Sequence, residues 1–170
     1  MSSFLQLASA VRARNVNLAR RMLKKGANAN EADSFGTTPL IIASYENYTD
    51  MVELLVKKGG ATVNLGDNAG GSPLNAAAQE NALSAAKLLI ERGGADVNQA
   101  NNNGTTPLLM SSENGHEEVV KLLLSNGANV DQATNDGDTP LFMSSQNGHQ
   151  AVAKLLLEKG ANVDQPRNDF

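Results

Sequence analysis

Residues 104–131 of the chain read GTTPLLMSSENGHEEVVKLLLSNGANVD. This stretch decides the fold because its elements recur along the whole chain. Its Pro-Leu pair is one of four, which start at Pro39, Pro73, Pro107 and Pro140. The distances between successive pairs are 34, 34 and 33 residues. A repeat of this size is typical of a solenoid, in which each unit buries its apolar face only by stacking on its neighbours.

Each repeat unit begins with the signals of a short helix. A hydroxyl residue precedes every one of these prolines, as in Thr106-Pro107. Thr or Ser at an N-cap, followed by Pro at the first helical position, satisfies free N–H groups and presets the first φ angle. The helix is expected to stop at residues that tolerate a left-handed backbone, which are Asn47, Asn81, Gly115 and Gly148.

A second helix follows in each unit. Residues 119–124 place Val and Leu on both sides of Lys121, so that a broad apolar stripe is buried and the lysine points to water. The helix then ends near Gly127, and an Ala-x-Val-Asn/Asp stretch leads into the next turn. The sequence therefore predicts two helices per unit, separated by Gly- and Asn-containing turns.

These linked motifs closely resemble the ankyrin repeat, and the resemblance covers essentially the whole chain. It implies an all-α solenoid of stacked antiparallel helix pairs, joined by projecting β-hairpin loops, with partners bound at the hairpin tips and the concave helix face. We expect about five repeats in one domain. Their approximate bounds are 1–32, 33–66, 67–100, 101–133 and 134–166.

The chain departs from the family pattern after each Pro-Leu pair. The family usually has His there, and this chain instead has Ile41, Asn75, Leu109 and Phe142. The hydrogen bonds that such a His supplies between neighbouring turns are therefore in doubt, and we expect Phe142 to fill the space left by the absent His.

Two units also contain one additional residue. It gives the sequences Gly59-Gly60-Ala61 and Gly93-Gly94-Ala95 near the end of the second helix. We interpret it as a surface insertion that lengthens the loop, since loops accept changes in length at small entropic cost.

The first thirty residues match a degenerate unit that lacks the Thr-Pro start. Arg21 stands where the other units have Leu54, Leu88, Leu122 and Leu155. Because terminal repeats need a polar outer face, we interpret this segment as an N-terminal cap. The segment is also rich in Arg and free of acidic residues, as mitochondrial presequences are. A presequence has no reason to keep the repeat register, which favours the cap.

The C-terminal end shows no comparable cap. The last helix, residues 151–159, keeps the apolar pattern of an internal unit. If the chain is part of a longer array, we expect Leu155, the counterpart of Arg21, to present apolar surface at this end, so that Leu155→Arg would be tolerated. Two explanations stay open: the chain is part of a longer array, or Pro166 and Phe170 cover the last unit.

Charge is unevenly placed along the chain. Six Lys or Arg side chains precede the first acidic residue, Glu31, and because the whole chain carries −4, residues 31–170 carry −10. Such an acidic array repels phosphate backbones, so no nucleic-acid partner is expected. We interpret the basic segment as a solvated capping face whose Lys24 and Lys25 suit a helix C-terminus. Contact with an acidic partner or with anionic lipid is the alternative.

The composition excludes several kinds of chemistry. The chain has no Cys, which removes disulfides, thiol catalysis and Cys-based metal sites, and it has no apolar run of membrane-spanning length. His116 and His149 occupy the same place in successive units, which indicates structural hydrogen bonding rather than metal binding. The Gly-rich residues 66–72 lack the Lys of a phosphate-binding loop. We therefore expect no enzymatic activity, no cofactor and no metal site.

Positions that vary between units without disturbing the helix signals are free to bind a partner. They lie on the turns and at the ends of the first helices. The candidates are Phe35, Thr37, Tyr45, Glu46, Asn68, Gln79, Glu80, Asn102, Asn103, Glu113, Asn114, Asp136, Asp138, Gln146 and Asn147. Phe35 and Tyr45 are the candidate anchors, because exposed aromatic residues are enriched at binding hot spots.

The sequence thus predicts a non-enzymatic protein–protein interaction module, monomeric and cytoplasmic, with nuclear location as a further possibility. The acidic candidates predict a partner that presents Lys or Arg around an apolar feature. Two alternatives stay open: a substrate-recruiting or regulatory domain of a larger enzyme, and a structural spacer.

Overall fold

The computed structural model describes residues 3–164, which form ten helices and no β-strand. The helices are α1 (Ser3–Arg12), α2 (Val16–Lys24), α3 (Pro39–Tyr45), α4 (Thr49–Lys58), α5 (Pro73–Gln79), α6 (Leu83–Gly93), α7 (Pro107–Glu113), α8 (Glu117–Ser125), α9 (Pro140–Gln146) and α10 (Gln150–Glu158). The predicted all-helical fold is confirmed.

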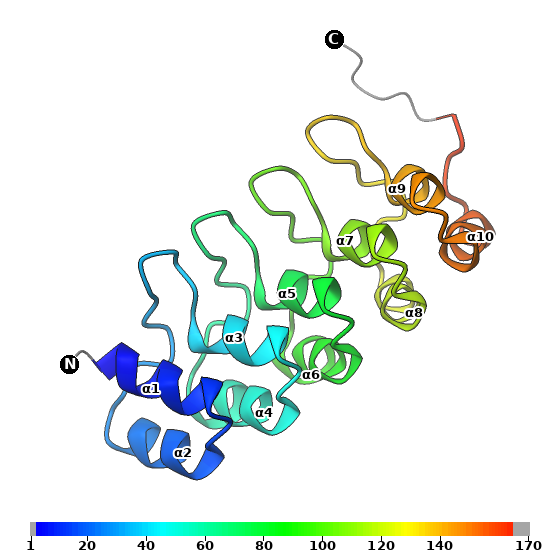
Figure 1. Ribbon diagram of the computed structural model, residues 1–170. Coiled ribbons are helices and arrows are strands. Elements are labelled where there is room, and N and C mark those ends of the chain that lie inside the picture. Colours follow the sequence, from blue (N-terminus) through cyan, green and yellow to red (C-terminus); the bar gives the residue numbers. More distant parts are fainter. Residues whose placement is uncertain (1–2, 165–170) are drawn as a thin grey trace.

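The helices form pairs that stack along one direction (Figure 1). The first helices, α1, α3, α5, α7 and α9, pack on one another in order, and the second helices, α2, α4, α6, α8 and α10, form a parallel layer. The loops that join successive pairs project beside the first helices, away from the second helices. Each pair therefore contacts mainly its immediate neighbours, as a solenoid requires.

The predicted start of each first helix is confirmed in the four internal and C-terminal units. Oγ1 of Thr38 accepts a hydrogen bond from the backbone N–H of Ile41 at 3.2 Å, and Thr106 and Thr139 cap α7 and α9 in the same way. Ser72 forms a full capping box with Asn75. These hydroxyl residues are buried, so the N–H groups at the start of each helix are out of reach of water. The hydroxyl oxygens supply the hydrogen bonds that water would otherwise make.

The predicted left-handed residues between paired helices are also confirmed. Asn47 and Asn81 both have φ near 54°, while Gly115 and Gly148 have φ of 72° and 76°. The Asn side chain tolerates this conformation better than most residues do. The backbone thus turns in the same way in all four units although the residue types differ.

The interpretation of the additional residue as a loop insertion is wrong. Helices α4 and α6 have ten and eleven residues, whereas α8 and α10 have nine. The left-handed glycine that follows the helix is Gly60 in one unit and Gly94 in the other. The residue extends the second helix because the helix continues to the next position at which a left-handed turn is favourable.

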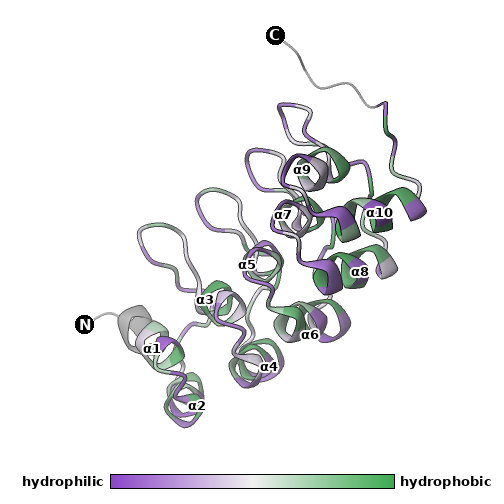
Figure 2. Cartoon of the chain, turned by 45° about the vertical axis from the view of Figure 1, so that its right-hand side comes forward, coloured by the Kyte–Doolittle hydropathy of each residue, from purple (hydrophilic) through white to green (hydrophobic). Residues whose placement is uncertain are grey.

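The apolar core runs continuously through the stack. Leu55, Leu89, Leu123 and Leu156, one from each of α4, α6, α8 and α10, are fully buried. Most small residues of the first helices are also buried, and the Ser144 hydroxyl donates to the carbonyl oxygen of Leu141 at 3.0 Å. Figure 2 shows the apolar residues on the helices and mainly hydrophilic ones along the projecting loops.

Asparagine side chains join the tips of neighbouring loops. The backbone N–H of Asn68 donates to the carbonyl oxygen of Phe35 at 3.0 Å, and its Nδ2 donates to that of Ser34 at 3.0 Å. Asn102 and Asn135 repeat the arrangement in the next two loops. The loops are therefore held to one another by this ladder of asparagines, and no β-strand occurs among residues 3–164.

The absent His is replaced in different ways along the stack. Nδ2 of Asn75 donates to the carbonyl oxygen of Thr105 in the next loop at 3.2 Å, so one hydrogen bond between turns is retained. Ile41 and Leu109 are buried there and contribute apolar contact instead. Phe142 is half-buried beside the last loop.

The N-terminal segment folds as a helix pair with its own buried residues. Leu7, Val11 and Ala19 are fully buried. Arg14 lies 3.6 Å from a carboxylate oxygen of Asp50, and its guanidinium carbon lies 5.2 Å from the centre of the Tyr48 ring. These contacts with the next unit agree with a cap that belongs to the solenoid.

The expected exposure of Leu155 at the C-terminal end is wrong. Its counterpart Leu88 lines a small gap together with Val52 and Val56 of the preceding unit, so this position faces backward along the stack. Leu155 is accordingly half-buried, whereas Leu157 is 47% exposed. Arg21 also faces backward along the stack. It is exposed to solvent because no described unit lies before the cap.

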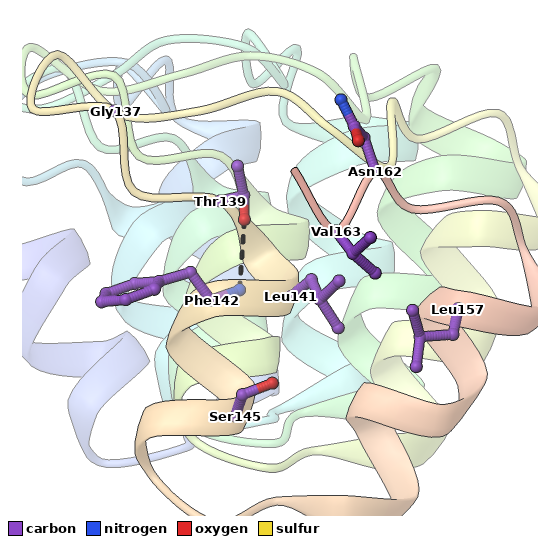
Figure 3. Close-up of a pocket in the computed structure, with 8 residues that line it drawn as sticks. All are labelled: Gly137, Thr139, Leu141, Phe142, Ser145, Leu157, Asn162 and Val163. Atoms are coloured by element: carbon purple, nitrogen blue, oxygen red, sulfur yellow. Dashed lines mark hydrogen bonds between the residues drawn. The ribbon is translucent and has the colours of Figure 1, made fainter. Parts of the chain in front are cut away.

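Leu157 belongs to an apolar hollow of about 320 Å³ at this end of the stack. Leu141, Leu157 and Val163 lie close together there, while the ring of Phe142 points away from them (Figure 3). The expected covering residues Pro166 and Phe170 lie outside the described residues, as do the last two residues of the predicted fifth repeat.

Candidate functional site

The projecting loops and the exposed sides of α3, α5, α7 and α9 form one surface, here called the inner face. A groove of about 440 Å³ on this face is lined both by two successive loops and by α7 and α9. Loops and first helices therefore contribute jointly to the same surface, as the distribution of the candidate residues predicted.

Four of the candidate residues line this groove. They are Asn103, Glu113, Asp136 and Asp138. The apolar part of the lining comes from Leu109, which is 2% exposed, and from the half-buried Met143. The groove thus combines three carboxylates with an apolar floor.

Three other candidates form a cluster nearer the N-terminus. Tyr45 at the end of α3 is 44% exposed, and Gln79 and Glu80 at the end of α5 are exposed. Nε2 of Gln79 donates to Oε1 of Glu80 at 3.2 Å. The pKa of the Tyr45 phenol is raised above 10.0, first by its hydrogen bond to Glu80 and then by the charge of that carboxylate.

We expect Tyr45 to lose its proton at a higher pH than an unperturbed tyrosine. In a Tyr48→Phe background, tyrosinate absorbance reports Tyr45 alone, because the chain has two Tyr and no Trp. Glu80→Gln should lower the midpoint, whereas Glu113→Gln should leave it unchanged. Because folding raises the pKa of Tyr45, the protonated phenol stabilises the folded chain. This contribution is complete below the pKa of the unfolded chain and is lost as the pH rises through the pKa of the folded chain. A midpoint insensitive to Glu80→Gln would refute the contact.

Phe35 lies at the tip of the first projecting loop with 74% of its surface exposed. The backbone on both sides of it is held in place, since its N–H donates to Oδ1 of Asp33 at 2.9 Å and its carbonyl oxygen accepts from Asn68. An exposed aromatic ring on a fixed backbone is well suited to serve as an anchor, because ordering it on binding costs little entropy.

Several candidates have structural roles that the reasoning from sequence missed. The backbone N–H and the side-chain amide of Asn68 and Asn102 bind the neighbouring loop, as described above. Nδ2 of Asn147 donates to the carbonyl oxygen of Glu113 at 2.8 Å, and that of Asn114 donates to Met110 within its own helix. The premise that these positions are free of structural constraint is therefore wrong, and their contact with a partner stays a prediction.

A signal for the asparagine ladder was present in the sequence. Asn68, Asn102 and Asn135 recur at the repeat period, each on the second residue before a loop glycine. A Cβ added to Gly36 would lie 2.6 Å from Oδ1 of Asn68, so that the asparagine rests directly on the preceding glycine. An asparagine that recurs at the repeat period, with a glycine at the loop position one unit earlier, indicates a structural residue and not a variable binding position.

The remaining candidates occupy the ends of the surface. Glu46 follows the last residue of α3, Gln146 is the last residue of α9, and both are exposed. Thr37 is half-buried, and its N–H donates to Oδ1 of Asp33 at 2.9 Å. The candidates therefore spread along the inner face instead of forming one compact site.

Both histidines bind the backbone of the preceding unit. Nε2 of His116 donates to the carbonyl oxygen of Gln79, and Nε2 of His149 donates to that of Glu113, both at 2.9 Å. The predicted structural role is confirmed, since each ring ties a second helix to the preceding unit. Within the described part of the chain, no three His, Asp or Glu residues gather as metal ligands would.

No helix within residues 3–164 has the length and apolar character that crossing a membrane requires.

Comparison with known proteins agrees with the stacked helix pairs. The family model for "Ankyrin repeats (3 copies)" matches residues 7–101 and 93–167. None of the curated proteins matches the chain. Since the two family matches together span most of its length, the chain belongs to the ankyrin-repeat family.

Proposed function

We propose that the chain is a non-enzymatic module that binds a basic segment of another protein on its inner face. Ankyrin repeats are generally protein–protein interaction modules, and the family is typically non-enzymatic. The partner chemistry and the binding face come from the residues of this chain.

The observation that carries the proposal is the separation of charge between the two helix layers. From residue 26 to residue 164, every Lys and Arg lies on a second helix or at its C-terminal cap. The loops and first helices over the same range carry Asp and Glu without a single base. A surface of one charge sign attracts a partner of the opposite sign and rejects partners of its own.

The groove between the last two loops fits a basic side chain. Glu113, Asp136 and Asp138 supply carboxylates, while Leu109 and Met143 offer apolar surface for the methylene stem. Lys and Arg side chains bind in this manner, with the stem on apolar surface and the charged end near acids. The groove supports a partner residue of this type without requiring any movement of the loops.

Phe35 and Tyr45 supply the apolar part of the proposed contact. Both are among the exposed large hydrophobic residues of the described chain. Burial of an aromatic ring at the centre of an interface contributes more to affinity than exposed charges at its rim. The proposed partner therefore combines Lys or Arg with an apolar residue.

A selection from a random peptide library displayed on phage tests this chemistry. We expect the wild-type chain to enrich peptides in which Lys or Arg flank an apolar residue. The Glu80→Gln/Glu113→Gln variant should fail to enrich them. Enrichment of acidic peptides, or equal enrichment by both proteins, would contradict the proposal.

The kinetics of an enriched peptide should separate the two kinds of contact. Glu80→Gln/Glu113→Gln should slow association and weaken its salt dependence, because rim charges mainly steer encounter. Tyr45→Ala should speed dissociation with unchanged helicity. Glu117→Gln/Glu118→Gln on α8 removes the same charge from the other helix layer and should have little effect. Binding that is lost only on changing Arg20 and Lys24 would place the site on the cap.

A further inference from the structure

We propose that the N-terminal end of the solenoid is a second binding surface, which adsorbs to anionic phospholipid membranes. This surface, the basic end, consists of Arg20, Arg21, Lys24, Lys25 and Lys58. It is distinct from the inner face, and the proposal does not depend on what the inner face binds.

The cations of the basic end form no ion pair within the described residues. Arg12 and Arg14 of the same segment are paired with Asp33 and Asp50, at 4.0 and 3.6 Å. The four cations on and after the last turns of α2 have no such ion pair, although Arg20 lines a hollow together with Asp50 and Glu53. A C-terminal helix dipole favours one or two cations there, but it does not account for this number.

Cations elsewhere on the second helices are mostly neutralised by their neighbours. Nζ of Lys121 lies 2.6 Å from Glu117 and 2.8 Å from Glu118, and these hydrogen bonds raise the pKa of the lysine. Nζ of Lys57 lies 2.6 Å from Glu53, which lowers the pKa of that carboxyl. Lys87 and Lys154 each lie within 3.9 Å of a Glu four residues later. The unneutralised positive charge is therefore concentrated at the basic end.

The shape of the basic end favours binding to a flat membrane surface over binding of a small ligand in a pocket. Arg21 occupies the backward-facing position of its unit, so this charge points out of the end of the stack. Leu18, one turn before Arg21, is 36% exposed and places an apolar side chain among the cations. Clusters of roughly four to eight Lys or Arg on such a helix are the pattern that binds anionic lipid headgroups.

A hollow that adjoins the basic end is poorly suited to a discrete anion. It measures about 270 Å³ and is lined by Asp50 and Glu53 as well as by Arg20, Lys57 and Lys58. A carboxylate or phosphate that entered it would meet these two carboxylates as well as the three cations, so that most of the attraction is offset. Diffuse attraction of the whole basic end to a charged surface does not require an anion to enter this hollow.

Flotation of the full chain with lipid vesicles tests the proposal. We expect binding to phosphatidylcholine vesicles that contain phosphatidylserine, no binding to phosphatidylcholine alone, and weakening as salt is raised. Replacing Arg20, Arg21, Lys24 and Lys25 by Gln should reduce the partition coefficient by roughly a hundredfold or more. The milder pair Arg21→Gln/Lys25→Gln should give an intermediate loss, and circular dichroism confirms that both variants are folded.

The matched control replaces Lys87, Arg92, Lys121 and Lys154 by Gln, which removes the same charge from ion-paired positions. It should keep most of the vesicle binding. An equal loss in the control, or full binding by the fourfold α2 variant, would overturn the proposal. So would tighter binding to duplex DNA or to polyglutamate than to vesicles. Glu80→Gln/Glu113→Gln should still float with vesicles, so this result is independent of peptide binding on the inner face.

Discussion

Leu123→Ala should lower the free energy of unfolding by about 2–5 kcal/mol, because truncating a fully buried leucine removes apolar contact and leaves a cavity. Leu123 is 0% exposed and lies on α8, between the units before and after it. Urea denaturation followed by circular dichroism measures the change.

Lys121→Ala is the control on the same helix. Lys121 is exposed and paired only with surface carboxylates, so its loss should cost less than about 1 kcal/mol. Comparable costs for the two substitutions would show that the register of α8 is wrong.

At the C-terminal end, Leu155→Arg should lower the free energy of unfolding by roughly 2–4 kcal/mol, because a charge would be pressed against the preceding unit without a partner. Leu157→Arg, two residues later, should change it by less than about 0.5 kcal/mol, since Leu157 is 47% exposed. Thermal and urea denaturation of the two variants measure the difference.

The reverse order, with Leu157→Arg the more damaging, would mean that Leu157 is covered in solution. This pair also distinguishes the two directions along the stack, because Leu155 faces the preceding unit and Leu157 faces the open end.

Local signals in the sequence predicted most of the fold. The Thr-Pro and Ser-Pro pairs start the first helices as expected, since an N-cap depends on residues within one turn. The left-handed Asn47 and Asn81 were predicted for the same reason. Such features need no knowledge of the neighbouring unit.

Features that depend on the neighbouring unit were predicted less well. Comparing units shows that Leu155 and Arg21 are equivalent, but it does not tell which neighbour the position faces. The asparagine ladder was mistaken for variable surface. Its asparagines recur at the repeat period, but their partners are backbone carbonyl oxygens of another loop, which no residue type identifies. The additional residue before Gly60 extends α4, and the left-handed turn moves with it to Gly60.

The candidate site was predicted as a surface but not as a groove. Asn103, Glu113 and Asp136 come from two loops and a helix, and only the stacking of units brings them together. Leu109 was considered only as a replacement for His, and its place on the floor of the groove follows from its burial.

The central claim is that the inner face binds a basic partner segment. It is tested most directly by backbone amide chemical shifts of the isotope-labelled chain during titration with the tightest peptide from the selection. We expect the largest shifts at the ends of α3, α5 and α7 and on the loop tips, at Tyr45, Glu80, Glu113 and Asp136. Shifts confined to α2, or to the outer sides of α4, α6, α8 and α10, would contradict the claim.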